Sequence, residues 1–370
     1  MKPKLKIAIL HPPMYPVNYH LYNLLSDYCE IDVFQFGEFP SDHVSWTVGN
    51  LKSIHKKFEF KVYGEGSDSI LNQVSYDFVG DIIKNRYDIV ISVAFWLPSI
   101  VAALTRKIKG FKLIIITDAN EFTEKNVSAM RSFQRKLLCR NVDGFISCSS
   151  LTSKYLLSLG VNHSKIFESF QTIDISSWNL KFDSLEDKTA LRHRLNLPLF
   201  SKIMLSVGGL TTKKNASIGF SILRESSNLH YVVVGEGPEL DGYFEAVKNL
   251  GISDKVTFVG RKEGDYLIEY FKSSDFFIFP SLYDQYGFVV VEALASGLPV
   301  LCSDKTGASS LIKDGFNGYL IDPSSIDSRI VIDLIDNIAF MQRDARFSVD
   351  ELTLENRAKE FNDIFLKVLN

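Results

Sequence analysis

The chain has 370 residues, about two to three times the size of a common domain, so two domains are expected. Hydrophobic residues make up 46% of it and charged residues 23%, which is typical of globular proteins and excludes a disordered chain, a collagen-like fibre and a coiled coil. The 41 Lys and Arg residues nearly balance the 44 Asp and Glu residues, for a net charge of −3. The overall charge therefore gives no indication of nucleic-acid binding.

The cysteines and the apolar runs bear on the compartment. The cysteines are Cys29, Cys139, Cys148 and Cys302. They lie far apart, without a CxxC or zinc-ligand spacing, which indicates a reducing compartment. The first apolar run, residues 7–10, is too short for a signal peptide and is followed by Pro12 and Pro13. The longest later run, residues 92–104, contains Pro98 and is shorter than the roughly 18 residues of a membrane span. The sequence thus predicts a cytoplasmic chain with neither a signal peptide nor a span.

Short runs of apolar, often β-branched residues alternate with amphipathic segments along the whole chain. The expected strands are residues 6–10, 31–35, 88–92, 111–117, 144–147, 202–207, 231–235, 256–259, 276–279 and 299–302. Nearly continuous apolar strands separated by helical patterns indicate parallel sheets that helices cover on both faces. The predicted fold class is α/β, with two doubly wound (Rossmann-like) domains.

The domain boundaries follow from composition. Residues 174–197 are polar and precede the strand at residue 202, while the last segment has the periodicity of an amphipathic helix. We predict one domain over residues 1–178, a second over 179–349 and a C-terminal helix over 350–370. The apolar positions of that helix are Phe361, Ile364, Phe365 and Leu369.

One predicted helix of the first domain is basic. Its basic residues are Arg131, Arg135, Lys136 and Arg140, and its apolar residues are Met130, Phe133, Leu137 and Leu138. Such a helix could lie on an anionic membrane surface. The alternative is an ordinary solvated basic face above an apolar stripe that packs in the core, and the sequence leaves both interpretations open.

Two glycine turns follow strands of the second domain, where a ligand could approach the backbone. The first, residues 206–215, contains Gly208 and Gly209, and its Lys213 or Lys214 could face a phosphate. It lacks the GxxxxGK[ST] pattern of a P-loop. The second, residues 234–238, contains Gly235 and Gly237 but not the third glycine of a dinucleotide fingerprint, so a plain tight turn explains it equally well.

A third loop, over residues 280–300, carries more information. The preceding strand ends at Pro280, and we expect a helix from about Gly287, whose free N–H groups suit an anion. Asp284 precedes this helix and Glu292 lies within it, and a carboxylate accepts hydrogen bonds from sugar hydroxyls. Asp284 could instead cap the helix. Glu292 could instead be an exposed acid of the helix, but the apolar residues around it predict a buried neighbourhood in which the carboxyl needs a partner.

With these loops in this order, the sequence resembles the retaining glycosyltransferases of family 4, which have the GT-B fold. The similarity is strongest over residues 207–323, which include the DQYGFVVVEALASGLPV block and the later DGFNG segment. The first half is similar to one branch of that family through HPPMYPVNYHLYNLL, TDAN with the basic helix after it, and FQTIDISSW. The resemblance thus covers most of the chain. It implies that the first domain binds the acceptor and the second a nucleotide-sugar.

The resemblance implies roles for individual residues of the donor site. Glu292 matches the acid that holds the ribose, Asp284 matches the acid that contacts the transferred sugar, and Lys214 matches the lysine that neutralises the diphosphate. The backbone of Gly287 and Phe288 would lie against the diphosphate and sugar. The remaining donor-site positions are Gly208, Gly209, Lys213, Gly235, Gly237 and Arg261, with Arg261 near the base.

Three positions depart from the family pattern. Gly209 stands where an arginine is usual, and Lys213 is a candidate to replace its charge. Asp284 is one methylene shorter than the usual glutamate, which bears on the donor sugar accepted. Pro12 and Pro13 replace a glycine pair of the first loop.

The resemblance also implies a mechanism. Cleavage of the donor builds negative charge on the leaving phosphate, and a lysine and a helix N-terminus stabilise it without a metal or other cofactor. Retention is expected through attack of the acceptor on the same face, since no side chain is placed as a double-displacement nucleophile. Asp284, Lys214 and Asp118 are the catalytic candidates.

The candidate acceptor residues of the first domain are His20, Asp118, Asn120 and Glu121, which we expect at strand ends that face the cleft between the domains. Asp118 is the candidate for contact with the acceptor hydroxyl, and a helix cap is its alternative. The expected partners are a nucleoside diphosphate sugar, a glycan or lipid-linked glycan of bacterial surface polysaccharide synthesis, and an anionic membrane surface. A sugar-nucleotide epimerase and a catalytically silent partner subunit are the alternative functions.

Overall fold

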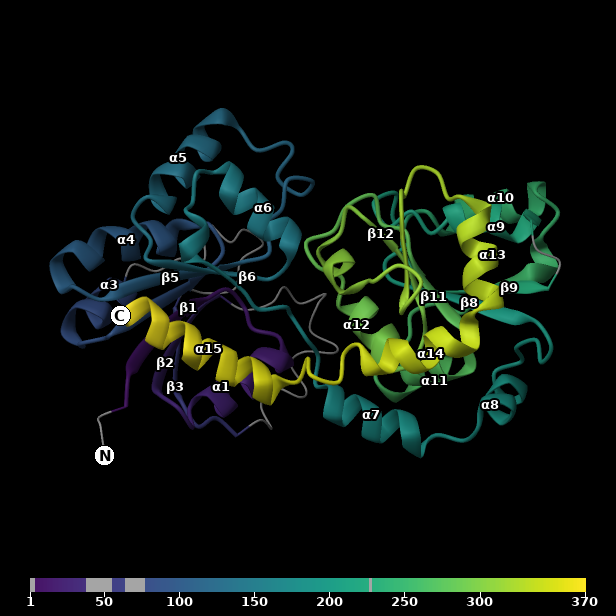
Figure 1. The fold of residues 1–370 in the computed structure, drawn as a ribbon, viewed down its shortest axis with the longest axis horizontal. Helices are drawn as coiled ribbons and strands as arrows, with labels where there is room; N and C mark the ends of the chain where they lie inside the picture. The colour runs from purple at the N-terminus through teal and green to yellow at the C-terminus, as the bar shows by residue number, and fades with distance from the viewer. Residues whose placement is uncertain (1–3, 38–54, 64–76, 226–227) are drawn as a thin grey trace. The chain divides into compact units, whose positions relative to one another are not determined.

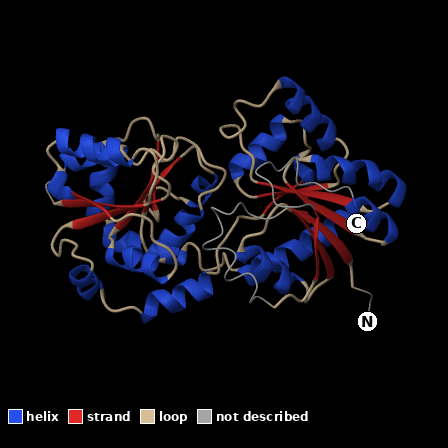
Figure 2. Ribbon diagram, turned by 180° about the vertical axis from the view of Figure 1, so that it is seen from behind, coloured by secondary structure: helices blue, strands red, loops and turns tan. Residues whose placement is uncertain are grey.

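The computed structural model describes residues 4–37, 55–63, 77–225 and 228–370. The chain forms two compact units, one made of Met1–Gln171 with Leu354–Asn370 and one made of Thr172–Thr353. Each contains one sheet between helices (Figures 1 and 2). The first boundary precedes the one predicted after residue 178 because Trp178 packs in the second unit, where its indole donates to Ser296 Oγ at 2.9 Å.

The sheet of the first unit has seven parallel strands in the order β3-β2-β1-β4-β5-β6-β7. Their bounds are β1 Lys6–His11, β2 Glu30–Phe36, β3 Glu59–Tyr63, β4 Ile89–Val93, β5 Lys112–Thr117, β6 Gly144–Ser147 and β7 Ile166–Glu168. Alternate residues of β1 enter different cores, since Ile7 and Ile9 pack on one face of the sheet and Ala8 and Leu10 on the other. Both faces are therefore buried, as a parallel sheet requires.

Helices of the first unit cover these two faces. One face carries α1 (Pro16–Leu25) and α15 (Leu354–Leu369), which pack against each other (Figure 1). Phe361 and Phe365 of α15 are 1% and 0% exposed, so the last helix of the chain completes this core. The other face carries α3 (Asp77–Lys84), α4 (Leu97–Lys109), α5 (Ala129–Cys139) and α6 (Ser150–Ser158).

The second unit has six parallel strands in the order β10-β9-β8-β11-β12-β13. Their bounds are β8 Lys202–Val207, β9 Leu229–Val234, β10 Val256–Phe258, β11 Phe276–Phe279, β12 Val300–Ser303 and β13 Gly318–Ile321. One face is covered by α9 (Ile218–Glu225), α10 (Leu240–Asn249), α13 (Ser328–Asp336) and α14 (Ile338–Phe347). The helices α11 (Asp265–Ser273) and α12 (Phe288–Ala295) pack on the strands β8, β11 and β12. The helices α7 (Ile175–Ser184) and α8 (Lys188–Arg194) contact this helix layer in turn.

The prediction of two doubly wound α/β domains is confirmed, and all ten predicted strands are present. The prediction missed β3, β7 and β13, which are edge strands. An edge strand is less buried than a central one, and the residues of β7 are indeed half-buried or exposed. Such strands lack the continuous apolar run on which the prediction depended.

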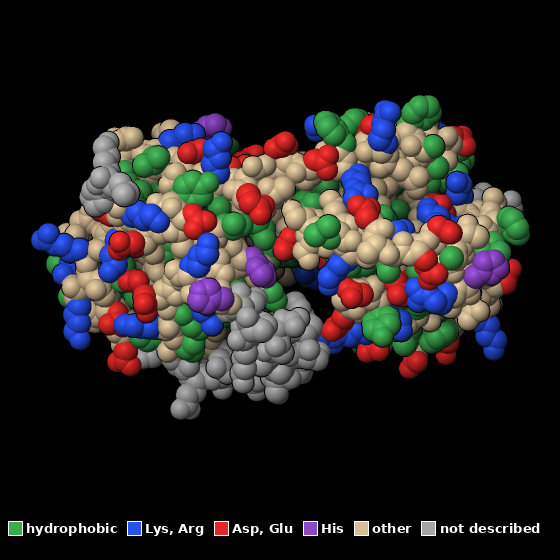
Figure 3. Space-filling view, turned by 90° about the horizontal axis from the view of Figure 1, so that it is seen from below, with side chains coloured by type: hydrophobic (Ala, Val, Ile, Leu, Met, Phe, Trp, Pro, Cys, Tyr) green, Lys and Arg blue, Asp and Glu red, His purple; other side chains and the backbone are tan. Residues whose placement is uncertain are grey.

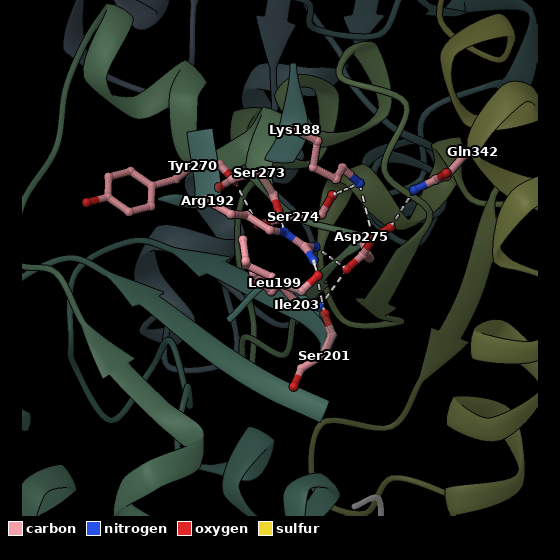
Figure 4. Close-up of polar contacts among 10 residues, drawn as sticks. All are labelled: Lys188, Arg192, Leu199, Ser201, Ile203, Tyr270, Ser273, Ser274, Asp275 and Gln342. Carbon is pink, nitrogen blue, oxygen red and sulfur yellow. Dashed lines mark hydrogen bonds and ion pairs between the residues drawn. The ribbon is translucent and has the colours of Figure 1, made fainter. Parts of the chain in front are cut away.

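A buried ion cluster fixes α8 at the beginning of the second sheet (Figure 4). Arg192 Nη2 and Lys188 Nζ lie 2.6 and 3.1 Å from the two carboxylate oxygens of Asp275, which also accepts from the Ile203 N–H at 2.7 Å. Burial alone would raise the pKa of Asp275, but Lys188, the Ile203 N–H and Arg192 outweigh it and hold that pKa below its ordinary value. Asp275 precedes β11 and Ile203 is the second residue of β8, so the cluster lies at the amino ends of the strands.

The surface shows no segregation of charge on the face drawn in Figure 3, where acidic and basic side chains are interspersed. This distribution agrees with the small net charge of −3. Within the described ranges, no helix is long and apolar enough to cross a membrane. Over the same residues, no group of three or more His, Cys, Asp or Glu side chains could hold a metal ion.

Candidate functional site

The loops after β8 and β9 lie against each other at the carboxyl edge of the second sheet. Backbone bonds join Gly208 N to Val234 O at 3.0 Å and Leu210 N to Glu236 O at 2.8 Å. A Cβ on Gly235 would lie 1.9 Å from Gly208 O, and a Cβ on Gly237 would lie 2.3 Å from Leu210 O. Gly235 and Gly237 are therefore required by the close approach of the two loops.

Gly209 differs from the other glycines of these loops. Its backbone is outside the left-handed region, and a Cβ there would have its nearest neighbour, Glu236 O, at 3.9 Å. That is an ordinary van der Waals distance, so a Cβ fits at Gly209. Space at the Cβ therefore does not explain why glycine stands where the family that the sequence resembles usually has an arginine.

Two lysines of the first loop meet the aspartate of the third. Lys214 Nζ lies 2.5 Å from Asp284 Oδ2, and Lys213 Nζ lies 3.7 Å from Asp284 Oδ1. Asp284 is 9% exposed, whereas both lysines are part-exposed. Each lysine also lies over a ring of the third loop or its strand, Lys213 at 5.1 Å from the Tyr283 centroid and Lys214 at 5.2 Å from that of Phe279. Two cations thus face one carboxylate, which leaves a net positive charge.

The N-terminus of α12 lies directly after this cluster. The helix begins at Phe288 with Gly287 as its N-cap, as predicted, and a glycine N-cap has no side chain to offer to the first N–H groups. Gly287 has φ = 110°, and a Cβ there would lie 2.6 Å from Cε1 of Phe279, so both conformation and space require glycine. Because the N-cap is Gly287 and not Asp284, the capping alternative for Asp284 is wrong; Asp284 Oδ1 accepts from the Gln285 N–H at 2.9 Å. The first N–H groups of α12 remain suited to an anion.

Glu292 lies one turn into α12 and is half-buried. Its Oε2 is sealed from solvent and has no hydrogen-bond partner among the residues that the structure describes. Burial raises the pKa of this carboxyl to about 7. The predicted buried neighbourhood is confirmed, and an unsatisfied carboxyl oxygen in such a place is suited to accept from ligand hydroxyls.

A small pocket connects the first and third loops. It is lined in part by Gly208, Gly209, Lys214, Phe279 and Ser281. The hydroxyl of Ser281 is buried and has no partner in the described part of the chain. Ser281 is not predictable from the sequence, because a serine after a strand gives no signal that would distinguish it. A larger pocket, between α9 and α13, is lined mainly by isoleucines and serines and lies away from these charged groups.

Arg261 follows β10 and is exposed at the neighbouring turn. Its guanidinium pairs with Glu263 at 2.5 Å, and its backbone N–H donates to Glu236 Oε1 at 3.4 Å. The carbonyl of Gly260 accepts from Gly235 N at 3.0 Å. Arg261 therefore lies beside the loop after β9, while its role at a base stays a prediction.

The candidate residues of the first unit have different positions and contacts. Asp118 follows β5 and accepts weakly from Gln171 Nε2 at 3.5 Å. The next helix, α5, begins only at Ala129 with Ser128 as its cap, so the capping alternative for Asp118 is wrong. Asn120 is wholly buried, and its Oδ1 accepts from the N–H groups of Phe122 and Thr123, which stabilises the turn.

His20 and Glu121 are both exposed. His20 lies within α1 and not at a strand end, so its predicted position is wrong: the helix already begins at Pro16, one turn earlier. Glu121 lies in the turn after β5. Pro12 of the first loop accepts a hydrogen bond from the ring of the buried His11 at 2.6 Å through its carbonyl.

Comparison with known proteins gives a family match that lies within the second unit. Residues 187–338 match the family described as glycosyl transferases group 1. The uncharacterized glycosyltransferase MJ1607 of Methanocaldococcus jannaschii is 32% identical over 158 residues, which are 42% of this chain and 40% of that protein. The alpha-monoglucosyldiacylglycerol synthase of Streptococcus pneumoniae is 27% identical over 236 residues, 62% of this chain and 53% of that protein. The chain spans about a third to a half of the length of the curated relatives it matches.

A solved structure matches both units. The crystal structure of Anabaena Alr3699/HepE in complex with UDP has a TM-score of 0.77 to this chain, covering 97% of it and 99% of that protein at 18% identity. At that identity the likeness shows a shared fold.

Proposed function

We propose that this chain is a retaining glycosyltransferase of family 4. The premise is that it has the GT-B fold and that its residues 187–338 match the glycosyl transferases group 1. The enzyme would move a sugar from a nucleoside diphosphate sugar to a hydroxyl of a glycan or lipid-linked glycan. The observation that carries the proposal is the contact of Lys214 with Asp284, 70 residues away in sequence, directly before the uncapped N-terminus of α12.

The donor site would divide its work among these groups. Lys214, Lys213 and the first N–H groups of α12 supply positive charge where a diphosphate needs it. Glu292, with its unpartnered Oε2, would accept from the ribose hydroxyls. Asp284 would contact the transferred sugar, and Gly208, Gly235, Gly237 and Arg261 would border the nucleotide. The UDP in the HepE structure supports a nucleotide donor at this fold.

The reaction would use these fixed charges. As the bond between the sugar and the phosphate breaks, negative charge develops on the leaving diphosphate, and Lys214 with the α12 N-terminus stabilises it. We propose that this stabilisation needs neither a metal nor another cofactor. The acceptor hydroxyl would attack the same face of the sugar from which the diphosphate leaves, with Asp118 of the first unit positioning it, so that the configuration is retained.

An exposed apolar face on the first unit supports a membrane-bound acceptor. Met130, Phe133 and Leu137 of α5 are 72%, 68% and 50% exposed, so only Leu138 among the four apolar residues packs in the core. The core-stripe alternative is therefore wrong for three of the four. Arg135 is not part of a solvated face either, because it pairs with Glu124 and donates to Tyr155 Oη at 2.9 Å.

The neighbouring helix α4, which contacts α5, extends this face. Its Ile100, Leu104 and Ile108 recur every four residues and are 36%, 64% and 83% exposed. Lys107, Lys136 and other exposed basic residues accompany the two stripes. Apolar residues accompanied by cations are typical of binding to an anionic membrane surface. We propose a protein of the cytoplasm that binds peripherally to the membrane and serves bacterial surface polysaccharide synthesis (O-antigen, capsule or lipopolysaccharide).

A catalytically silent partner subunit is the second candidate, because Gly209 removes one cation of the family's site. Unfolding temperatures measured with UDP-, GDP-, ADP- and CDP-sugars test both. A sugar nucleotide at 100 times its Kd adds about 2.7 kcal/mol of stability. We expect one nucleotide class to stabilise the wild type and Glu245→Ala, a control at an exposed glutamate of α10, but not Glu292→Ala.

Stabilisation without transfer to any acceptor extract would favour the silent subunit. Stabilisation by none of the four nucleotide classes would overturn the donor site. Conversion of the donor to an epimer without an acceptor would favour the epimerase.

A further inference from the structure

Among the residues that the structure describes, Arg357 is a buried cation with no carboxylate in contact. It lies in the first turn of α15, and its side chain is 8% exposed. No carboxylate lies within 4.0 Å of its guanidinium in the described part of the chain, and Nε is sealed from solvent without a hydrogen-bond partner. Nη1 and Nη2 have no hydrogen-bond partner there either and, unlike Nε, are not fully sealed from solvent. Buried charges are normally paired, so this one needs an explanation.

The groups around Arg357 do not neutralise it. Its guanidinium lies 5.3 Å from the Phe361 centroid. It is close enough to lower the pKa of the Tyr22 hydroxyl and of the Cys148 thiol, yet burial holds the pKa of Tyr22 well above its ordinary range and that of Cys148 at about 11. Burial also lowers the pKa of His11, whose ring contacts Tyr22, to about 4. These three groups are therefore uncharged at neutral pH.

The nearby carboxylates are turned to other partners or remain at a distance. On α15 itself, Glu360 lies one turn further along and accepts from Ser169 Oγ at 2.9 Å. Asp118 lies near enough to Cys148 for its charge to raise the pKa of that thiol, which Arg357 lowers. Both charges are therefore close to Cys148, and within the described residues no ion pair of 4.0 Å or less joins them.

This position is at the carboxyl edge of the first sheet. His11 is the last residue of β1, and Cys148 follows β6 and donates through its N–H to Thr117 O at the end of β5 at 3.1 Å. Ligands of doubly wound sheets bind outside the carboxyl ends of the strands. A buried, unpaired guanidinium at this edge is placed as a ligand group would be.

We propose that Arg357 binds an oxyanion, a phosphate or a carboxylate, carried by the acceptor. The planar guanidinium donates two parallel hydrogen bonds to such a group. With Asp118 also near Cys148, the edge would hold an acceptor that offers a hydroxyl and a negative charge. The inference rests on the proposed glycosyl transfer and narrows its acceptor to an anionic class.

The experiment measures anion binding to the full-length chain with Lys214→Ala, which removes the donor-site lysine. Unfolding temperatures are recorded with glucose 6-phosphate, with glucuronate and with glucose. The first compound carries a phosphate, the second a carboxylate and the third no charge, so the effect of each group is measured separately. We expect one or both anions to bind and glucose to bind at least ten-fold more weakly. Adding Arg357→Met should weaken binding of the anion at least ten-fold, and Arg357→Lys should weaken it less. Lys359→Met, at an exposed neighbour on α15, should leave anion binding unchanged.

A structural role for Arg357 predicts different results. If the arginine served only to stabilise the fold, Arg357→Met would lower the unfolding temperature without ligand, whereas removal of an unpaired buried charge should leave it equal or higher. Unchanged anion binding in Arg357→Met, no anion binding in the parent, or a large loss of stability without an anion effect would each overturn the inference. None of these results depends on the donor, so the sugar-nucleotide panel still tests glycosyl transfer separately.

Discussion

Replacement of Glu292 by Gln should change how the stability of the second unit depends on pH. Burial raises the pKa of this carboxyl from its ordinary value of 4.5 to about 7 in the folded protein. The difference between the two values corresponds to about 3 kcal/mol of unfolding free energy. Glutamine keeps the shape of the side chain but does not titrate, so any cost of its buried amide is the same at every pH.

The direction follows from the protons that each state binds. Below pH 4.5 the carboxyl is protonated in both the folded and the unfolded chain. Between pH 4.5 and about 7 the unfolded chain releases the proton and the folded chain keeps it, so the unfolding free energy falls as the pH rises. Above about pH 7 both states are ionised and the loss is complete. Glu292 therefore destabilises the free protein at alkaline pH.

Urea unfolding of wild type and Glu292→Gln at pH 5 and pH 8 measures this effect. The stability of the variant relative to wild type should rise by about 2.5 kcal/mol between the two pH values, because a smaller part of the loss already occurs below pH 5. In a domain of this size that corresponds to about 5–10 °C in unfolding temperature. Glu245→Gln, at an exposed position of α10, should follow wild type. Parallel pH profiles for wild type and Glu292→Gln would refute the argument that burial of this carboxyl controls its ionisation.

Three further changes test other parts of the structure. Gly209→Arg should strengthen nucleoside diphosphate binding several-fold in a titration, since a Cβ fits there and the side chain adds a cation; weaker binding would contradict this. Asp275→Asn should cost about 3–5 kcal/mol in urea unfolding because it leaves Arg192 buried without its carboxylate, and a loss below 1 kcal/mol would contradict that role. Deletion of residues 350–370 should abolish soluble expression or activity because α15 completes a core of the first unit, and an active truncated protein would show that it does not.

The sequence by itself determined the central architecture. Strands such as residues 144–147 and 276–279 are buried on both faces, so they appear as continuous apolar runs, and the alternation with helical patterns indicated two parallel sheets. The edge strands β3, β7 and β13 escaped prediction because their partial exposure interrupts that pattern. The helix start at Gly287 was predictable because its signals are local in sequence.

Only the tertiary structure decided which residues meet. Lys214 and Asp284 contact each other because β8 and β11 are neighbours in the sheet, and no sequence spacing contains that fact. The exposure of Phe133 depended on which face of α5 packs on the sheet, which helical periodicity cannot specify when apolar and basic residues are mixed. Arg357 looked like an ordinary residue of an amphipathic helix. Its charge became notable once the fold buried it at the strand ends with no carboxylate of the described ranges in contact, because pairing and burial are properties of the packed chain.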